Sequence, residues 1–536
     1  MGTNNRKARR KKQQRIIWLI SALAVFMIIV IAGCLIALVV KTLGGGSGDG
    51  KETSAVANNT QTSAVADQSQ SVPSDNTEQY DITIDVPTSP EPATASQPSG
   101  SNIPDSSAPT LTGDALLDAA NVKAAMYDYD AATSMLQNSA EYSTNAKYQE
   151  AVNRYAQEKA GLVKWADNTK ICHIFFHTLI YDNDLSFDDA SDTEKYNKVM
   201  TTITEFNRIL EQLYERGYVL VNVYDIARLE TMEDGTQKMV RQPIYLPPGK
   251  TPIVMSQDDV SYYEYMTGDG YANRLVVLED GYVTCEMDMP DGTKQRGAFD
   301  MIPILDNFVK AHPDFSYRGS KGIIALTGYN GVFGYRTSHY NYGPENEGRD
   351  GKGYLYPNPN IDADTETAKQ VADALKATGW TFACHGWGHR AMGQAELDHF
   401  YWDLDLWIAE VTPIIGPCDH IIYPNGDDVG NFWQYTNTEK QTPQGQVKYQ
   451  YMKDRGFRYF CNVDSNQPWV QITDEYFRQG RLNVDGQRLY EAIVGYRDLL
   501  SQFIDPFYVW DRDRPEPVAG VPIPDGYVIG TYSDRT

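Results

Sequence analysis

Apolar and polar positions follow two different periods along the second half of the chain. Short apolar runs bounded by turn residues are typical of buried strands, and apolar residues at three- and four-residue steps are typical of helices. The clearest predicted strands cover residues 171–177, 218–223, 252–255, 321–326, 380–384 and 420–423. The clearest predicted helices cover residues 196–216, 364–378 and 397–415. Because strands and helices alternate along the chain, the pattern predicts an α/β domain over residues 166–504, built on a parallel sheet or barrel.

Helical segments are also expected before this domain. Residues 114–165 carry apolar side chains at helical steps, first from Leu116 to Leu136 and again from Tyr148 to Leu162. This spacing predicts an αα-hairpin that acts as a stalk or brace. Residues 505–536 are rich in proline and are expected to form an extended tail that wraps the domain.

A long apolar run lies near the start of the chain. Residues 16–40 contain no charged side chain, and a helix of this length would cross a hydrocarbon core of ~30 Å. Basic residues gather before it, within residues 1–15, which predicts a cytoplasmic N-terminus, a single-pass membrane anchor and an extracellular domain. A cleaved signal peptide, or a lipoprotein cleaved before Cys34, are the alternatives to an uncleaved anchor.

The segment after this run has a different composition. Residues 44–113 are dominated by Ser, Thr, Asn, Gln, Gly, Asp and Pro. Such a segment cannot bury enough apolar surface to fold by itself. We therefore predict a disordered linker that acts as a spacer.

The overall composition excludes one class of partner. The chain has 536 residues, 41% of them hydrophobic, and a formal net charge of -24 at pH 7. A nucleic-acid-binding protein needs a basic face to neutralise phosphates, so no nucleic-acid partner is expected. The cysteines show no paired short spacing, so we predict neither a disulfide framework nor a zinc-thiolate site.

Three short motifs each follow a predicted strand. They are the pair Asp258 and Asp259, the step from His385 to His389, and the turn formed by Tyr423, Pro424, Asn425 and Gly426. The carboxyl ends of parallel strands meet at one rim of a barrel, where active sites are built. One carboxylate and two imidazoles form a ligand set that leaves coordination positions open for water and substrate. The motifs therefore predict a metal-dependent hydrolase in which the second carboxylate can act as a base.

The region from about residue 170 to 465 resembles the polysaccharide deacetylase family, also called the NodB homology domain. The family's Thr-Phe-Asp-Asp-Gly motif corresponds to residues 256–260, its His-Ser/Thr-x-x-His motif to residues 385–389, and its Pro-Tyr-Gly turn to residues 424–426. The resemblance implies a distorted (β/α) barrel and a polysaccharide or peptidoglycan substrate.

The resemblance also implies roles for single residues. Asp259, His385 and His389 would bind a divalent metal, with zinc as the expected ion, and Asp258 would be the catalytic base. The metal and a backbone amide within residues 423–426 would hold the oxyanion. These roles predict a metal-dependent extracellular deacetylase that hydrolyses N-acetyl groups of cell-wall or exopolysaccharide amino sugars. The alternatives are an O-acetyl esterase and a catalytically degenerate domain that binds glycan or organises the wall.

The chain departs from the family pattern at several positions. Gln257 and Val260 replace the aromatic residue and the glycine of the first motif, and Ile422 stands where an arginine usually orients the base. No histidine follows His420, so the usual late histidine that protonates the leaving amine is missing. The sequence leaves the general acid unassigned, with these residues as candidates: His173, His177, His339, Asp464 and Asp485.

Overall fold

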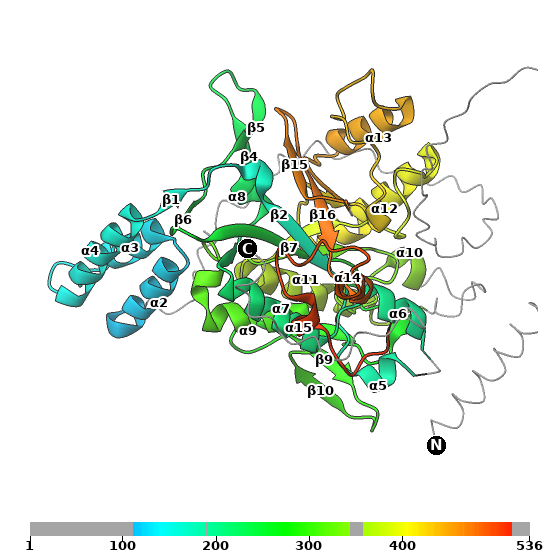
Figure 1. Cartoon of the computed structure of the whole chain (residues 1–536), viewed down its shortest axis with the longest axis horizontal. Helices are drawn as coiled ribbons and strands as arrows, with labels where there is room; N and C mark the ends of the chain where they lie inside the picture. Colours follow the sequence, from blue (N-terminus) through cyan, green and yellow to red (C-terminus); the bar gives the residue numbers. More distant parts are fainter. Residues whose placement is uncertain (1–110, 189–190, 344–356, 465, 517–536) are drawn as a thin grey trace, which may run out of the picture. The chain divides into compact units, whose positions relative to one another are not determined.

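The computed structural model describes residues 111–188, 191–343, 357–464 and 466–516 (Figure 1). All of them belong to the second of two compact units, which covers residues 90–536. The predicted basic tail at residues 1–15 and almost all of the predicted linker lie outside the described residues.

The structure does not support the predicted single-pass membrane location. Across the described part of the chain, no helix is both long and apolar enough to cross a bilayer. The longest, α12 (Leu397–Ile415), has 19 residues but carries Asp403, Asp405 and Glu410 along its length, and charged groups are costly to place in hydrocarbon. The apolar run at residues 16–40 lies outside the described residues, so the prediction of an anchor has no structural support.

The domain is mixed α/β and is built on a closed barrel of seven parallel strands, as the alternating pattern predicts. In order around the barrel the strands are β2 (Cys172–Phe176), β7 (Thr251–Gln257), β11 (Ile323–Leu326), β12 (Thr381–Cys384), β13 (His420–Ile422), β14 (Tyr459–Val463) and β16 (Phe477–Asn483). The barrel closes where β16 pairs with β2. Two further strands join its outside: β3 (Tyr218–Leu220) pairs with the start of β7, and β15 (Trp469–Ile472) runs antiparallel to β16.

Each barrel strand has one face toward the helices and one toward the barrel interior. On β7, Ile253 and Met255 belong to the core shared with the helices, whereas Val254 belongs to the cluster that fills the barrel. Ser256, next on the inner face, bonds to His173 of β2, with Oγ 2.8 Å from Nε2. Because side chains alternate along a strand, the residue that follows on the inner face is Asp258.

The helices that cover the barrel follow the strands in sequence. They include α7 (Ile203–Glu215), α9 (Met301–Ala311), α11 (Ile361–Ala377), α12, α13 (Pro443–Asp454) and α14 (Gly486–Ile493). The helix predicted over residues 196–216 is in fact two, α6 (Thr193–Val199) and α7. The break occurs because Thr202 and Glu205 form a capping box that starts a new helix.

Three helices, rather than the two of the predicted hairpin, form the first part of the unit. They are α2 (Gly113–Ala125), α3 (Tyr129–Gln137) and α4 (Ala146–Ala160), drawn in blue and cyan in Figure 1. The first predicted helix is interrupted because Tyr127 has a left-handed φ of 63° and Asp128 caps α3. Residues of these helices share a buried cluster with inner-face residues of the barrel, such as Val254 and Ile323. The role of these helices as a stalk or brace stays a prediction.

The remaining elements are short. They are β1 (Val163–Lys164), α5 (Asn183–Ser186), α8 (Val223–Ile226), β4 (Ala227–Thr231), β5 (Gln237–Arg241), β6 (Tyr245–Leu246), β8 (Arg274–Val277), β9 (Val283–Asp288), β10 (Lys294–Gly297), α10 (His339–Tyr342) and α15 (Pro506–Val509). After α15 the chain is tied to the domain by Arg514, whose Nη1 lies 2.6 Å from Oε2 of the fully buried Glu205.

Candidate metal centre

Asp258 and Asp259 lie where β7 reaches the carboxyl rim of the barrel. The amide of Asp258 donates to the carbonyl of Phe176 at 2.8 Å, which extends the pairing of β7 with β2 by one residue. At Asp259 the backbone turns into the left-handed region, with φ at 63°. This turn ends the strand and places two consecutive carboxylates at the rim.

The structure brings together the three predicted metal ligands. Oδ1 of Asp259 lies 3.8 Å from Nε2 of His385 and 3.7 Å from Nε2 of His389. Among the described residues, these three form the one group of His, Cys, Asp and Glu side chains whose donor atoms all lie within 4.8 Å of one another. One carboxylate and two imidazoles suit a divalent ion such as zinc and leave positions open for other ligands.

Hydrogen bonds orient these donors. Nδ1 of His385 lies 2.7 Å from the carbonyl of Ile422, which can only accept, so Nδ1 carries the proton and Nε2 faces Asp259 with its lone pair. Burial lowers the pKa of His385 to about 4, which keeps its imidazole neutral at neutral pH. The Tyr263 hydroxyl donates to Oδ1 of Asp259 at 2.6 Å. The residues present therefore fit a metal ion.

The loop between the two histidines is held by Asp403 of α12. Its carboxylate accepts from the amides of Trp387 and Gly388 at 2.8 and 2.7 Å. At Gly386, φ is 65° and an added Cβ would lie 2.8 Å from Oδ2 of Asp403, so this position favours glycine. His389 also has a left-handed φ, of 54°. Strained backbone of this kind persists where the surroundings hold it, often at functional sites.

Asp258 is held by Arg481, an arginine from β16. Its Nη1 donates to Oδ1 of Asp258 at 2.7 Å and its Nη2 to Oδ2 at 2.9 Å, and both side chains are buried. Burial alone would raise the pKa of Asp258, but the Arg481 guanidinium holds it below its ordinary value. The carboxylate is therefore ionised and able to accept a proton. Ile422, which stands where the deacetylase motif usually has an arginine, lies inside the barrel. The positive charge beside Asp258 comes instead from Arg481 on β16.

The third motif places fewer amides at the rim than the sequence allows for. The amide of Tyr423 donates to the carbonyl of Cys461 at 2.9 Å within the sheet, and that of Gly426 donates to the carbonyl of Tyr423 at 3.0 Å. Pro424 has no N–H. Within the described residues the amide of Asn425 has no acceptor, and its φ of 57° belongs to a tight turn. Of the predicted oxyanion donors at 423–426, only Asn425 remains.

Most of the candidate general acids are used elsewhere in the structure. His173 is buried inside the barrel between Ser256 and Gln479, and burial lowers its pKa well below the ordinary value. Asp464 accepts from the indole of Trp469 at 2.7 Å, and Asp485 caps α14. His339 begins α10.

His177, by contrast, lies at the same rim as Asp258. It directly follows Phe176, which pairs with Gln257 across β2 and β7, so His177 and Asp258 are next to each other in the register. Its ring meets the ring of Phe175 edge-on at 5.8 Å, and the Arg481 guanidinium lies 4.0 Å from the centre of the Phe175 ring.

Comparisons with known proteins give two structural neighbours. No family model and no curated protein sequence matches the chain. Among solved structures, the chain is similar to the deacetylase PplD from Streptococcus pyogenes in complex with acetate, with 12% identity and a TM-score of 0.30, over 61% of this chain and 95% of that one. It is also similar to BC0361, a polysaccharide deacetylase from Bacillus cereus, with 11% identity and a TM-score of 0.28, over 60% of this chain and 65% of that one. Both neighbours are deacetylases.

Proposed function

We propose that this domain is a metal-dependent carbohydrate deacetylase that hydrolyses N-acetyl groups of a polysaccharide amino sugar. One observation carries the proposal: three metal donors lie beside an ionised carboxylate that is held by an arginine. Nε2 of His385 is 3.9 Å from Oδ2 of Asp258, so the base and the metal donors face one space. Asp259, His385 and His389 would hold the ion, for which zinc is our expectation. A bound divalent metal supplies Lewis acidity for the attack of water on an acyl group.

The residues around that space have the groups that amide hydrolysis needs. Oδ2 of Asp258 takes a proton from the attacking water while Arg481 keeps the carboxylate ionised and fixed. The oxygen of the water bonds to the acetyl carbon, and the carbonyl oxygen becomes an oxyanion. The free amide of Asn425 is the backbone donor available to this oxyanion.

We assign the final proton transfer to His177. Breakage of the C–N bond releases acetate and leaves an amine nitrogen that must gain a proton. Nδ1 of His177 donates to the carbonyl of Val199 at 3.1 Å, and in the described part of the chain Nε2 has no hydrogen-bond partner. The side chain is half-buried and therefore open to a substrate. Nε2 of His177 delivers the proton that the missing late histidine delivers in the family.

A histidine that can supply the final proton favours an enzyme over a degenerate domain that only binds glycan. An O-acetyl esterase would use the same metal donors and base, but an alkoxide leaves more readily than an amine that has not gained a proton, so ester hydrolysis would depend less on His177.

The test is acetate release from N-acetylglucosamine oligomers by the purified full-length protein, with its metal content measured in parallel. We expect one divalent metal per chain, acetate release by the wild type, and loss of release in Asp258→Asn with the metal retained. Release of acetate from O-acetylated xylan alone would replace the amidase with the esterase. Bound metal with no acetate release from either substrate would overturn the proposal.

A further inference from the structure

A cavity lies beside the third-motif turn, outside the metal centre. Its volume is about 320 Å³, within the range of small-ligand sites. It is bounded by the turn, by the loop that follows, by the end of β14 and by β15 and β16. The residues that matter for its chemistry are Gly426, Phe432, Asn462, Asp464, Trp469 and Arg478.

The rings of Phe432 and Trp469 form the apolar part of this cavity. Phe432 is 65% exposed, and Trp433, which follows it outside the lining, is 51% exposed. The rings of Phe432 and Trp469 lie 6.0 Å apart at an angle of 70°. Apolar rings that stand together in water are unfavourable unless a ligand or partner covers them. Pyranose rings have faces of C–H groups that pack well on aromatic rings.

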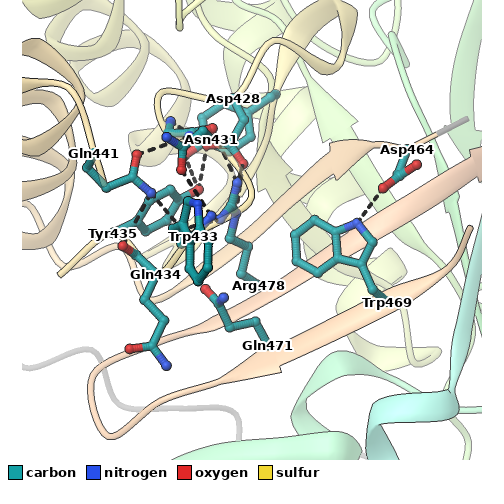
Figure 2. A network of polar contacts seen from close by, with 12 residues as sticks. Asp428, Asn431, Trp433, Gln434, Tyr435, Gln441, Asp464, Trp469, Gln471 and Arg478 are labelled. Atoms are coloured by element: carbon teal, nitrogen blue, oxygen red, sulfur yellow. Dashed lines mark hydrogen bonds and ion pairs between the residues drawn. The ribbon is translucent and has the colours of Figure 1, made fainter. Parts of the chain in front are cut away.

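The aromatic walls are fixed before any ligand binds. The indole of Trp469 donates to Oδ2 of Asp464 at 2.7 Å, as Figure 2 shows. The ring also lies against Gly480, where an added Cβ would come within 2.5 Å of the indole nitrogen. A fixed ring loses little conformational entropy when a ligand packs on it.

Arg478 fixes the loop that carries Phe432. Its guanidinium pairs with Asp428 at 2.7 Å and donates to the carbonyl of Trp433 at 3.1 Å and to that of Gly430 at 3.3 Å. In Figure 2, Arg478 joins the network around Asp428, with Trp469 and Asp464 on its other side. The loop is thus tied to β16 from within, and its aromatic side chains remain outside.

Asn462, one of the lining residues, carries a polar atom that the protein does not use. Oδ1 of Asn462 is buried, and within the described residues it has no hydrogen-bond partner. A buried carbonyl oxygen without a donor is costly, and a hydroxyl or amine of a ligand would satisfy it.

The charges around the cavity define which sugars fit. Asp427, Asp428 and Asp464 line it, and Arg478 is the cation among the lining residues. Arg478 is already paired with Asp428. The excess of carboxylates disfavours anionic sugars and suits hydroxyl groups or a protonated amine.

The position of the cavity relates it to the metal centre. Gly426 lines it and directly follows Asn425, whose free amide belongs to the proposed reaction site. We infer that this cavity is a sugar-binding subsite: it holds a neutral or amine-bearing pyranose of the same glycan whose N-acetyl group reaches the metal centre. This inference rests on the proposed function for the identity of the glycan, but the binding itself requires no turnover.

The test is binding of three pentasaccharides to the full-length protein in a chelator, measured by calorimetry so that hydrolysis does not occur. The probes are pentamers of N-acetylglucosamine, of glucosamine and of galacturonic acid. We expect at least one of the first two to bind and the anionic pentamer to bind at least tenfold more weakly. Phe432→Ala should raise the Kd for the bound pentamer about tenfold, and Asn462→Ala severalfold. Neither substitution removes a hydrogen bond that the structure assigns to the side chain.

Tyr496→Ala is the matched control, because Tyr496 is 80% exposed and lies outside the cavity lining. It should leave the Kd unchanged. Absence of binding by both amino-sugar pentamers, an unchanged Kd in Phe432→Ala, or equal binding of the anionic pentamer would overturn the subsite. Acetate release by the metal-loaded wild type is measured separately, so failure of the subsite and failure of the deacetylase are distinguishable.

Discussion

Arg481 holds Asp258 with two parallel hydrogen bonds, although the residues are 223 positions apart in the chain. The pair lies inside the barrel, where β16 and β7 both flank β2. A carboxylate that is buried without a cation tends to take up a proton and would lose its function as a base. The proposed mechanism therefore depends on an arginine outside the three motifs.

Arg481→Lys tests this dependence. Lysine keeps the charge but cannot form both bonds, so we expect kcat for acetate release to fall roughly ten- to a hundredfold. Metal content and KM should stay near their wild-type values, because Arg481 contacts neither the donor atoms nor the substrate space. Arg488→Lys is the control, since Arg488 pairs with Glu491 on α14. Unchanged kcat in Arg481→Lys would show that the pair only supports the fold.

His177→Gln tests the assignment of the general acid. Glutamine can still donate a hydrogen bond but cannot deliver a proton, so we expect kcat on an N-acetylated oligosaccharide to fall about a hundredfold or more. The same variant should hydrolyse p-nitrophenyl acetate almost as fast as the wild type, because nitrophenolate leaves without protonation. Parallel kinetics on the two substrates make the measurement. Equal losses on both would mean that His177 positions the site rather than supplying the proton.

His389→Ala tests the metal set. Its side chain is 27% exposed, so its removal should disturb the fold little while taking away one of three donors. We expect affinity for zinc to fall at least a hundredfold. In thermal unfolding, zinc should raise the Tm of the wild type and not that of the variant, since a ligand stabilises only the state it binds. The exposed His399 on α12 gives the control His399→Ala, which should retain the zinc response. A zinc response that survives in His389→Ala would remove His389 from the site.

The sequence predicts the barrel, and the meeting of Asp259, His385 and His389 at one rim, because both depend on local pattern. Asp259, His385 and His389 each follow a buried strand, and parallel strands necessarily bring their ends to one rim. Arg481 could not be assigned in the same way, since pairing across the barrel depends on the order in which the strands close. One signal was present: Gln479 and Arg481 occupy alternate positions of a strand that is buried throughout most of its length, and a buried arginine requires a buried anion.

The sequence could not predict which backbone amide of the third motif is free to bind an oxyanion. Tyr423, Asn425 and Gly426 are all rim residues with amide groups, and the sequence gives no reason to choose among them. Hydrogen bonds decide which amide stays free, because the amide of Tyr423 donates to β14 and that of Gly426 donates within the turn. Hydrogen bonds of this kind depend on register, which sequence periodicity does not fix.

Asp419 predicts a pH dependence of stability that is separate from catalysis. Burial raises the pKa of Asp419 to about 6, above the ordinary value near 3.9 of the unfolded chain. Between these values the folded protein binds the proton more tightly. The free energy of unfolding therefore falls as pH rises through this window and does not change further above it on account of this group.

The substitution Asp419→Asn should remove this fall in the free energy of unfolding. Asparagine keeps an oxygen to accept from the Tyr224 hydroxyl, which lies 2.5 Å from Oδ1, and it carries no charge. Because the side chain is only partly buried, we expect a modest gain in the free energy of unfolding, roughly 1–2 kcal/mol at pH 8, and no gain at pH 4. Denaturant unfolding at both pH values measures it, with Asp118→Asn on the exposed face of α2 as the control. A gain of equal size at pH 4 and pH 8 would contradict the prediction, because only a change in ionisation makes the gain depend on pH.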